Sequence, residues 1–219
     1  MAKKKALSNK DIMSLYMNYV LKHNKKPDTV YKFSSENKFD EQDFYMHFTS
    51  FEALEKYIFN IFFENTIGIL NKSQDYNSFD SRNKLLSFYY TFFENLTANR
   101  SYVMFSLEQE KNSLKGLKKL SKLRHNFTNY IKEIDIDMID VKQKQIDQIQ
   151  QKALQESAWV QFLITLKFWM EDSSKSFEKT DIFIEKSVNT SFDILQITPL
   201  KSVIDFGKFL FKEKVNLNL

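Results

Sequence analysis

Apolar residues recur at helical spacing along almost the whole chain. Ile12, Tyr16, Tyr19 and Val20 keep a three-to-four-residue period, which predicts a helix over residues 9–23. The same period predicts further helices over residues 29–36, 41–47, 50–72, 79–97, 101–110, 114–134, 158–172 (with a polar, Gln-rich first half from residue 140), 181–195 and 199–212. The pattern therefore favours three short helices, a long one, and then a series of amphipathic helices.

Residues that begin or end helices support these boundaries. Asn24 follows the first predicted helix, and asparagine tolerates the left-handed conformation that closes many helices. Asp40 is followed three residues later by Asp43, and Thr49 is followed by Glu52 at the same interval. Both pairs have the spacing of a capping box, so we expect helices to begin just after Asp40 and just after Thr49.

Composition indicates an all-α protein. The 219 residues include three glycines and two prolines, whereas average usage would supply roughly 15 and 11. Sheet-rich folds need turn residues at short intervals along the chain, and this sequence does not provide them. We therefore predict an all-α fold.

The same composition argues against catalytic and metal chemistry. The chain has no cysteine, so it has neither disulfides nor thiolate ligands. The glycines are isolated, which excludes a glycine-rich phosphate loop, and the three histidines are far apart without zinc-binding spacing. We expect no enzyme activity, no catalytic residues, no cofactor and no metal site.

Localisation follows from two further absences in the sequence. The lysines near the N-terminus are not followed by the apolar run of a signal peptide. No stretch approaches the ~18 uncharged apolar residues that cross a bilayer. We therefore expect a soluble, cytoplasmic protein without a transmembrane segment.

A motif in the N-terminal helices resembles a known family. The chain reads Thr29-Val30, Phe33-Ser34, Asn37-Lys38-Phe39-Asp40, Phe44-Tyr45-Met46-His47-Phe48 and Ser50-Phe51-Glu52-Ala53-Leu54. This segment resembles the helix-turn-helix domain of TetR-family transcriptional regulators, and its most specific part is Tyr45-x-His47-Phe48 with the end around Glu52. The resemblance implies a TetR-like fold of about nine to ten helices, with a DNA-binding-like domain over residues 1–50 and a ligand-binding and dimerisation domain over residues 51–219.

The resemblance also implies which residues meet DNA. They are Lys26, Thr29, Lys38, Gln42, Tyr45 and His47. Lys38 stands where the family has its turn glycine, so a non-glycine residue must hold the corner.

Charge along the first 50 residues is uneven. Residues 1–26 carry seven lysines and one aspartate, whereas residues 27–50 carry two lysines and five acids. The expected recognition helix contains Asp40, Glu41 and Asp43 without a basic residue. Because phosphate contacts supply most non-specific DNA affinity, the acidic helix weakens the expected binding, and the lysine-rich residues 1–26 offset part of that loss.

Aromatic residues of the second domain form the candidate ligand site. They are Phe88, Tyr89, Phe92, Tyr102, Phe105, Phe127, Tyr130 and Trp159. The resemblance implies a cavity here for an apolar or lipid-like small molecule, with tyrosine hydroxyls orienting it. Aromatic residues at helical spacing equally indicate an ordinary core, and both interpretations stay open.

A homodimer interface is expected on the helices over residues 158–172 and 181–195. The residues assigned to it are Trp159, Phe162, Leu166, Trp169, Ile184, Val188 and Phe192. Two helices from each of two subunits would form a four-helix contact with isologous symmetry.

Two basic amphipathic segments keep a second function open. Residues 111–124 carry six positive charges and no negative one, which suits either a solvated helix face or an anionic partner. Residues 199–212 pair an apolar arc with a lysine-rich stripe, which suits docking on protein or peripheral contact with a membrane. We expect a dimeric, ligand-responsive transcriptional regulator. The alternative is a lipid-binding protein without DNA binding, similar to the TetR-fold accessory proteins of coenzyme Q biosynthesis.

Overall fold

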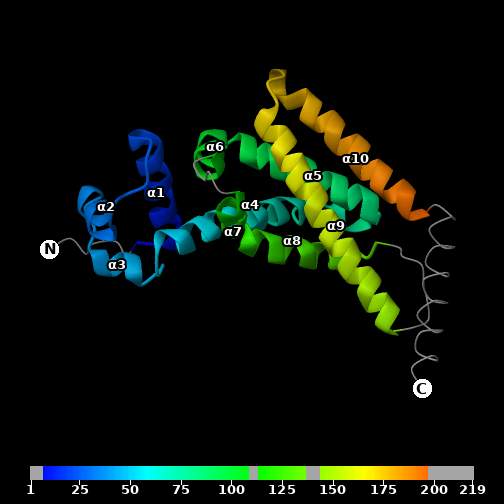
Figure 1. The fold of residues 1–219 in the computed structure, drawn as a ribbon, viewed down its shortest axis with the longest axis horizontal. Coiled ribbons are helices and arrows are strands. Elements are labelled where there is room, and N and C mark those ends of the chain that lie inside the picture. The colour runs from blue at the N-terminus through cyan, green and yellow to red at the C-terminus, as the bar shows by residue number, and fades with distance from the viewer. Residues whose placement is uncertain (1–6, 109–112, 137–143, 197–219) are drawn as a thin grey trace. The chain divides into compact units, whose positions relative to one another are not determined.

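The computed structural model describes residues 7–108, 113–136 and 144–196, and every regular element in these ranges is helical (Figure 1). The α-helices are α1 (Asn9–His23), α2 (Val30–Glu36), α3 (Glu41–Tyr45), α4 (Phe51–Leu70), α5 (Ser81–Thr97), α6 (Arg100–Glu108), α7 (Ser113–Lys119), α8 (Ser121–Glu133), α9 (Lys144–Glu171) and α10 (Glu178–Gln196). Two short 3-10 helices, η1 (Tyr76–Ser78) and η2 (Lys175–Phe177), precede α5 and α10. The predicted all-α class is confirmed.

The N-terminal order of three short helices and a long one is also as predicted. Asn24 closes α1 with a left-handed φ of 50°, and the amide of Asp40 donates to the Asp43 carboxylate at the start of α3, at 3.3 Å. The start of α4 differs from the prediction by one residue. Ser50, not Thr49, is the N-cap, since the Ser50 hydroxyl accepts a hydrogen bond from the Ala53 amide at 3.2 Å.

The single helix predicted over residues 114–134 is wrong, because the chain breaks there into α7 and α8. The break falls at Leu120, whose amide bonds the carbonyl of Leu117 and whose carbonyl accepts from Arg124. The leucines of this segment recur every three residues, so on a straight helix each is rotated by about 60° from the previous one. The interruption lets Leu120 and Leu123 both be buried.

Further along the chain, the Gln-rich segment forms the first half of α9, as predicted. The start predicted near residue 140 lies outside the described residues. The helix predicted over residues 199–212 lies outside the described residues.

Contacts divide the chain into two units. Unit 1 comprises residues 1–72 and 91–127, and unit 2 comprises residues 73–90 and 128–219. Helices α5 and α8 each contribute residues to both units. The predicted domain boundary at residue 50 falls between α3 and α4, and it stays a prediction because the contacts divide the chain elsewhere.

An aromatic cluster forms the N-terminal part of the core of unit 1. Phe33 of α2 is fully buried at its centre, and its ring centroid lies 5.5–6.2 Å from those of five other aromatic residues. They are Tyr16, Tyr19, Phe39, Phe44 and Phe51. Edge-to-face contacts predominate, which is a favoured arrangement of aromatic pairs. One buried ring thus holds α1, α2, α3 and the start of α4 together.

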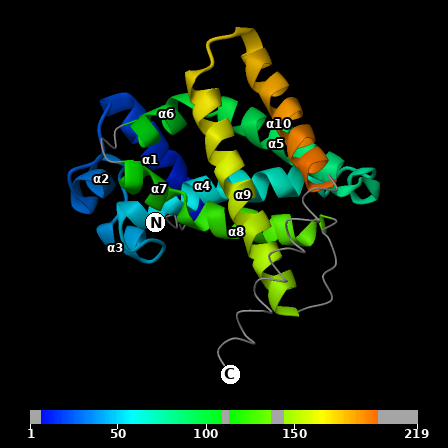
Figure 2. The same cartoon turned by 45° about the vertical axis from the view of Figure 1, so that its right-hand side comes forward.

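The core of unit 2 combines aromatic stacking with hydroxyl bridges. Phe88 stacks on Tyr130 with centroids 4.9 Å apart, and the hydroxyls of Tyr76 and Tyr130 are 2.8 Å apart. Ser81, at the start of α5, donates to the carbonyl of Ile134 at 2.8 Å. Helices α9 and α10 lie side by side in both views (Figure 1, Figure 2).

Candidate functional site

The turn between α2 and α3 contains a residue in the left-handed region. Lys38 has a φ of 60°, a conformation that favours glycine. The amides of Lys38 and Phe39 donate to the carbonyls of Ser35 and Ser34 at 3.2 and 3.1 Å, and Phe39 is buried. Backbone hydrogen bonds and one buried ring therefore hold the corner where the sequence has lysine in place of glycine.

Three of the six residues predicted to contact DNA are exposed on the turn and on α3. They are Lys38, Gln42 and Tyr45, and Tyr45 is 52% exposed. Phe44 is fully buried, so α3 is anchored through one face and presents another to solvent. A DNA contact by these residues stays a prediction.

The other three predicted residues are engaged or partly covered. The hydroxyl of Thr29 accepts from the Lys32 amide at 3.1 Å and caps α2. His47 is half-buried. The ammonium group of Lys26 lies 3.0 Å from a carboxylate oxygen of Glu55, so it forms an ion pair within the chain.

Most acidic side chains of residues 27–50 have local partners. Asp28 accepts a hydrogen bond from Lys32 at 2.9 Å and lies 3.6 Å from Lys25, and the bond from Lys32 lowers the pKa of Asp28. Glu36 lies 3.7 Å from the imidazole of His23. These acids are occupied within the structure of the N-terminal helices.

The acids of α3 stand in its first turn. Asp40 is the N-cap, Glu41 is the first helical residue and the Asp43 carboxylate turns back to the Asp40 amide. Negative charge is stabilising at this end of a helix, where backbone amides lack intrahelical partners. The acidity of α3 thus has a structural explanation that the sequence analysis did not give.

Sequence reasoning missed a cluster around Glu55, which is 1% exposed in the second turn of α4. Its carboxylate accepts from the Tyr16 hydroxyl at 2.8 Å and from Lys26 at 3.1 Å. A third group, the ammonium of Lys119, lies 3.5 Å away. Burial, and then the Glu55 charge, raises the pKa of Tyr16 far above its ordinary value, so the hydroxyl keeps its proton and donates.

One signal of this cluster was present in the sequence. Glu55 stands three and four residues before Ile58 and Phe59, on the apolar face of α4. A carboxylate on such a face requires buried partners. Lys119 could not be singled out in the same way, because it lies in a run of lysines and its neighbours Lys118 and Lys122 both face solvent.

The predicted ligand residues of unit 2 are packed into its core. Tyr130 uses its hydroxyl internally, toward Tyr76 at 2.8 Å and the Lys84 carbonyl at 2.9 Å. Trp159 stacks on Phe162 with centroids 5.2 Å apart. The members in this unit are Phe88, Tyr89, Tyr130 and Trp159, and all four are buried.

The remaining predicted ligand residues belong to unit 1. They are Phe92, Tyr102, Phe105 and Phe127, of which all but Phe105 are buried. Phe105 lines a groove of about 410 Å³ with Leu21, Asn24, Ser101 and Glu108. The eight residues are therefore distributed between the two units, and their ligand role stays a prediction.

The residues predicted for the dimer interface are buried within the chain itself. Trp159, Phe162, Leu166, Trp169, Ile184, Val188 and Phe192 are each at most 8% exposed. An interface on α9 and α10 would therefore have to use other faces of these helices.

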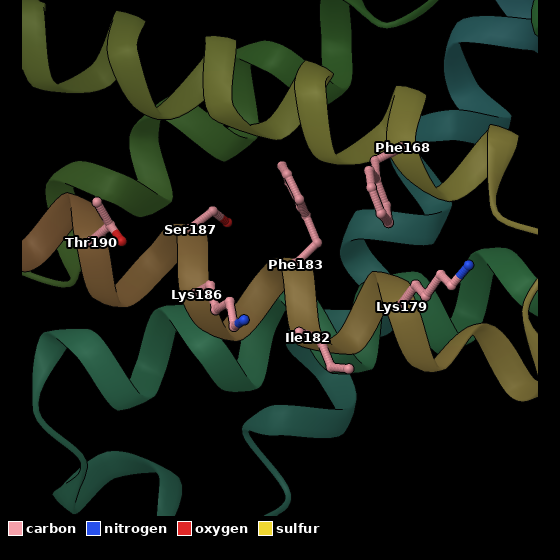
Figure 3. A pocket seen from close by; sticks show the side chains of 7 residues that line it. All are labelled: Phe168, Lys179, Ile182, Phe183, Lys186, Ser187 and Thr190. Carbon is pink, nitrogen blue, oxygen red and sulfur yellow. The ribbon is translucent and has the colours of Figure 1, made fainter.

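Another face of α9 and α10 carries an apolar groove of about 550 Å³ (Figure 3). Phe168 of α9 and Phe183 of α10 reach toward each other, and their rings stack with centroids 4.6 Å apart. Ile182, Ser187 and Thr190 continue the lining, with Lys179 and Lys186.

Neither a membrane span nor a metal cluster is found in the part of the chain that the structure describes. No helix there has the length and hydropathy needed to cross a bilayer. Likewise, no group of three or more histidine or acidic side chains in these ranges is arranged to hold a metal ion.

The C-terminal part of the chain matches a family of known proteins. No curated protein matches the chain. Residues 84–210 match the family described as tetracyclin repressor-like, C-terminal domain. Because this match covers more than half of the chain and the fold is all-helical, the protein belongs to the TetR family.

Proposed function

We propose that this TetR-family protein is a dimeric transcriptional regulator that binds DNA through α2 and α3. The observation that carries the proposal is the exposure of three side chains, Lys38 in the turn before α3 and Gln42 and Tyr45 on α3 itself, while the buried Phe44 anchors this helix. Recognition helices of this type read base edges with exposed side chains while a buried face fixes their orientation.

The local pairing of acids supports DNA binding despite the net negative charge of this segment. Asp28 has two lysine neighbours, Lys25 and Lys32, and Asp43 caps α3. Repulsion of phosphates is weaker when a carboxylate is already paired with a cation or with backbone amides.

The test is a titration of the protein against DNA from the region upstream of its own gene. We expect binding whose affinity falls steeply between about 50 and 200 mM salt. Binding of the protein releases cations from the DNA phosphates, and a higher salt concentration opposes this release. Replacing Gln42 and Tyr45 together with alanine should lower the affinity at least about tenfold. The matched control is Tyr90→Ala, which removes an exposed tyrosine from unit 2.

Absence of binding by the unmodified protein at low salt would contradict the proposal. That result would favour the lipid-binding alternative. Mass spectrometry of an organic extract of the purified protein then decides whether an apolar molecule is carried. The same extract tests the further proposal, which follows from membership of the family, that the regulator responds to an apolar ligand.

We propose that the dimer contact uses the solvent-exposed face of α9 and α10, opposite the residues that are buried within the chain. Val160, Ile164 and Phe168 are spaced by four residues and form one stripe on α9. Val160 and Ile164 are each 53% exposed, and the groove beside Phe168 continues the apolar surface onto α10. Small residues of α10, Ser187 and Thr190, allow close approach of a second copy.

Ile164→Asp tests this interface, since it places a charge on the stripe without disturbing the core. We expect a monomer with unchanged helix content, measured by analytical ultracentrifugation and circular dichroism. Ile69→Asp is the control, because Ile69 of α4 is similarly exposed at 54%. An unmodified protein that is monomeric at micromolar concentration would refute the interface.

A further inference from the structure

An exposed cationic surface lies where α7 meets α8, and the proposed function does not use it. Lys118 near the end of α7 and Lys122 in the first turn of α8 are both exposed, and these two lysines are called the α7–α8 surface below. Between Gly116 and Lys132 the chain contains no aspartate or glutamate. Within the described residues, neither Lys118 nor Lys122 forms an ion pair. Two positive charges of unit 1 are therefore available to an anionic partner.

The ring of Tyr57 on α4 holds Lys122 in place. The ammonium group of Lys122 lies 5.8 Å from the centroid of this ring, within the range of a cation–π contact. Next to this contact, Asn126 of α8 donates to the side chain of Asn60 on α4 at 2.6 Å. A lysine that is already positioned loses less conformational entropy on binding a partner than a freely rotating lysine does.

Tyr57 also connects the α7–α8 surface to the predicted DNA contacts. The centroid of its ring lies 5.2 Å from that of Phe48, which in turn lies 6.5 Å from that of the His47 imidazole. Phe48 is buried, so this path is part of the packed structure. His47 is one of the residues predicted to contact DNA. Three successive contacts thus join Lys122 to the edge of the proposed DNA interface, inside one compact unit.

One acidic side chain, Glu64, acts on this region. Burial and then the Glu64 charge raise the pKa of Tyr57, whereas a hydrogen bond with Asn9 lowers it. Glu64 stands two turns after Tyr57 on α4, and therefore further from Phe48 along the helix. Its carboxylate accepts a hydrogen bond from Asn60 at 2.5 Å. The negative charge is thus engaged within α4, beyond Tyr57 as seen from α3.

The anionic partner could be a nucleic acid or a lipid surface, and the exposed apolar side chains distinguish the two. A helix that binds lipid inserts a broad apolar face. In residues 116–133, Leu117 is the only large apolar side chain that is exposed, whereas Leu120, Leu123 and Phe127 are buried. A single leucine does not make such a face. Lysines bind DNA phosphates without any apolar contact, so the surface fits DNA better.

We propose that the α7–α8 surface is a second DNA contact, in which Lys118 and Lys122 bind phosphates that flank the bases read by α3. The inference rests on the proposed function, because it extends the interface of α2 and α3 onto α7 and α8. It adds positive charge to an interface whose residues 27–50 carry two lysines and five acids. Phosphate contacts carry no base information, so this surface adds affinity for all sequences alike.

The test compares the unmodified protein with the double variant Lys118→Gln/Lys122→Gln in a salt titration against the upstream DNA. Each lysine–phosphate contact adds about 0.9 to the slope of log affinity against log salt, so the slope should fall by roughly two. Near about 0.1 M salt the affinity should fall at least about tenfold, and equally for an unrelated duplex. The hydroxyl-radical footprint should become shorter, because the flanking sugar-phosphate backbone is no longer covered.

Two further variants control for charge and chemistry. Lys72→Gln/Lys132→Gln removes the same net charge from two other exposed lysines, one after α4 and one in α8, and should leave the slope and the footprint unchanged. Lys118→Arg/Lys122→Arg keeps the charge and should keep the slope. Circular dichroism should show unchanged helix content in all variants, because exposed substitutions of this kind have small effects on stability.

A slope and a footprint of Lys118→Gln/Lys122→Gln equal to those of the unmodified protein would overturn the inference and leave the proposed function standing. An equal fall of the slope in the charge control would also overturn it, since net charge alone would then explain the effect. Binding to phosphatidylglycerol vesicles that the double variant loses, together with an unchanged DNA slope, would overturn it in favour of a membrane. Failure of the unmodified protein to bind DNA at low salt would refute the proposed function and the α7–α8 surface together.

Discussion

Two buried carboxylates, Glu55 in unit 1 and Asp172 in unit 2, are held in contrasting ways. Glu55 is bound by side chains 39, 29 and 64 positions away along the chain, two of which are cationic. Asp172 is bound by the amide of Ser174 at 2.8 Å and by the amide and hydroxyl of Thr180 at 2.9 and 2.7 Å.

Glu55 therefore makes a tertiary connection between distant parts of the chain, whereas Asp172 makes a local one. Glu55 connects four elements of unit 1, so its charge stabilises how those elements are assembled. Asp172 shapes the short connection between α9 and α10, in which Ser176 and Phe177 both have positive φ values of 54° and 61°. Non-glycine residues in this region are strained and need such support. Because more elements depend on Glu55 than on Asp172, we expect substitution of Glu55 to lower the free energy of unfolding more than substitution of Asp172.

The largest effect is expected from Glu55→Ala. The substitution removes the carboxylate that the Tyr16 hydroxyl, Lys26 and the buried Lys119 share, and a buried hydroxyl then loses its acceptor. We expect the free energy of unfolding, measured by urea denaturation, to fall by about 3 kcal/mol.

Glu133→Ala is the matched control, because Glu133 is an exposed glutamate at the end of α8. Its effect should stay within about 0.5 kcal/mol. Equal losses for the two variants would contradict the tertiary role of Glu55.

A smaller and pH-dependent effect is expected from Asp172→Asn. Desolvation acts to raise the pKa of Asp172, but hydrogen bonds from Ser174 and Thr180 outweigh it and lower the pKa to about 2. The ionised form is therefore favoured in the folded state. Its stabilisation is present above the ordinary aspartate pKa and is lost as pH falls through the folded value. Above about pH 5 the variant should be less stable by about 1 kcal/mol, as for loss of a helix cap.

Thermal unfolding of both proteins between about pH 2 and pH 6 checks this prediction. The difference in melting temperature should shrink as pH falls below about 4 and vanish near the folded pKa. A difference that is constant over this range would show that Asp172 acts through its shape rather than its charge.

The fold was largely predictable because helices leave a local signature. The bounds of α1 were predicted from its apolar period and from Asn24, and α9 was recognised through its polar first half. The break at Leu120 was not predicted, since it depends on which leucines the rest of unit 1 can bury. Local periodicity carries no information on that.

The candidate sites were less predictable for the same reason. The exposure of Gln42 and Tyr45 follows from a local motif, whereas the engagement of Lys26 by Glu55 is a contact across 29 positions. A helical stripe identified Trp159 and Val188 as apolar, but not whether they face their own unit or a second copy.

The smallest effect is expected where the buried polar group is neutral. The Tyr130 hydroxyl bridges Tyr76 and the Lys84 carbonyl, and burial raises its pKa well above the ordinary tyrosine value, so it carries no charge at any physiological pH. Tyr130→Phe keeps the ring that stacks on Phe88 and removes only the hydroxyl. A neutral hydrogen bond contributes about 1 kcal/mol net, so the loss of unfolding free energy measured by urea denaturation should be near that value and independent of pH between about 5 and 8.

Tyr90→Phe is the control, because it removes a hydroxyl from an exposed tyrosine of α5, and it should cost less than about 0.5 kcal/mol. A loss for Tyr130→Phe as large as that for Glu55→Ala would contradict the ranking, because it would mean that a neutral bridge in unit 2 is as critical as the charged cluster of unit 1.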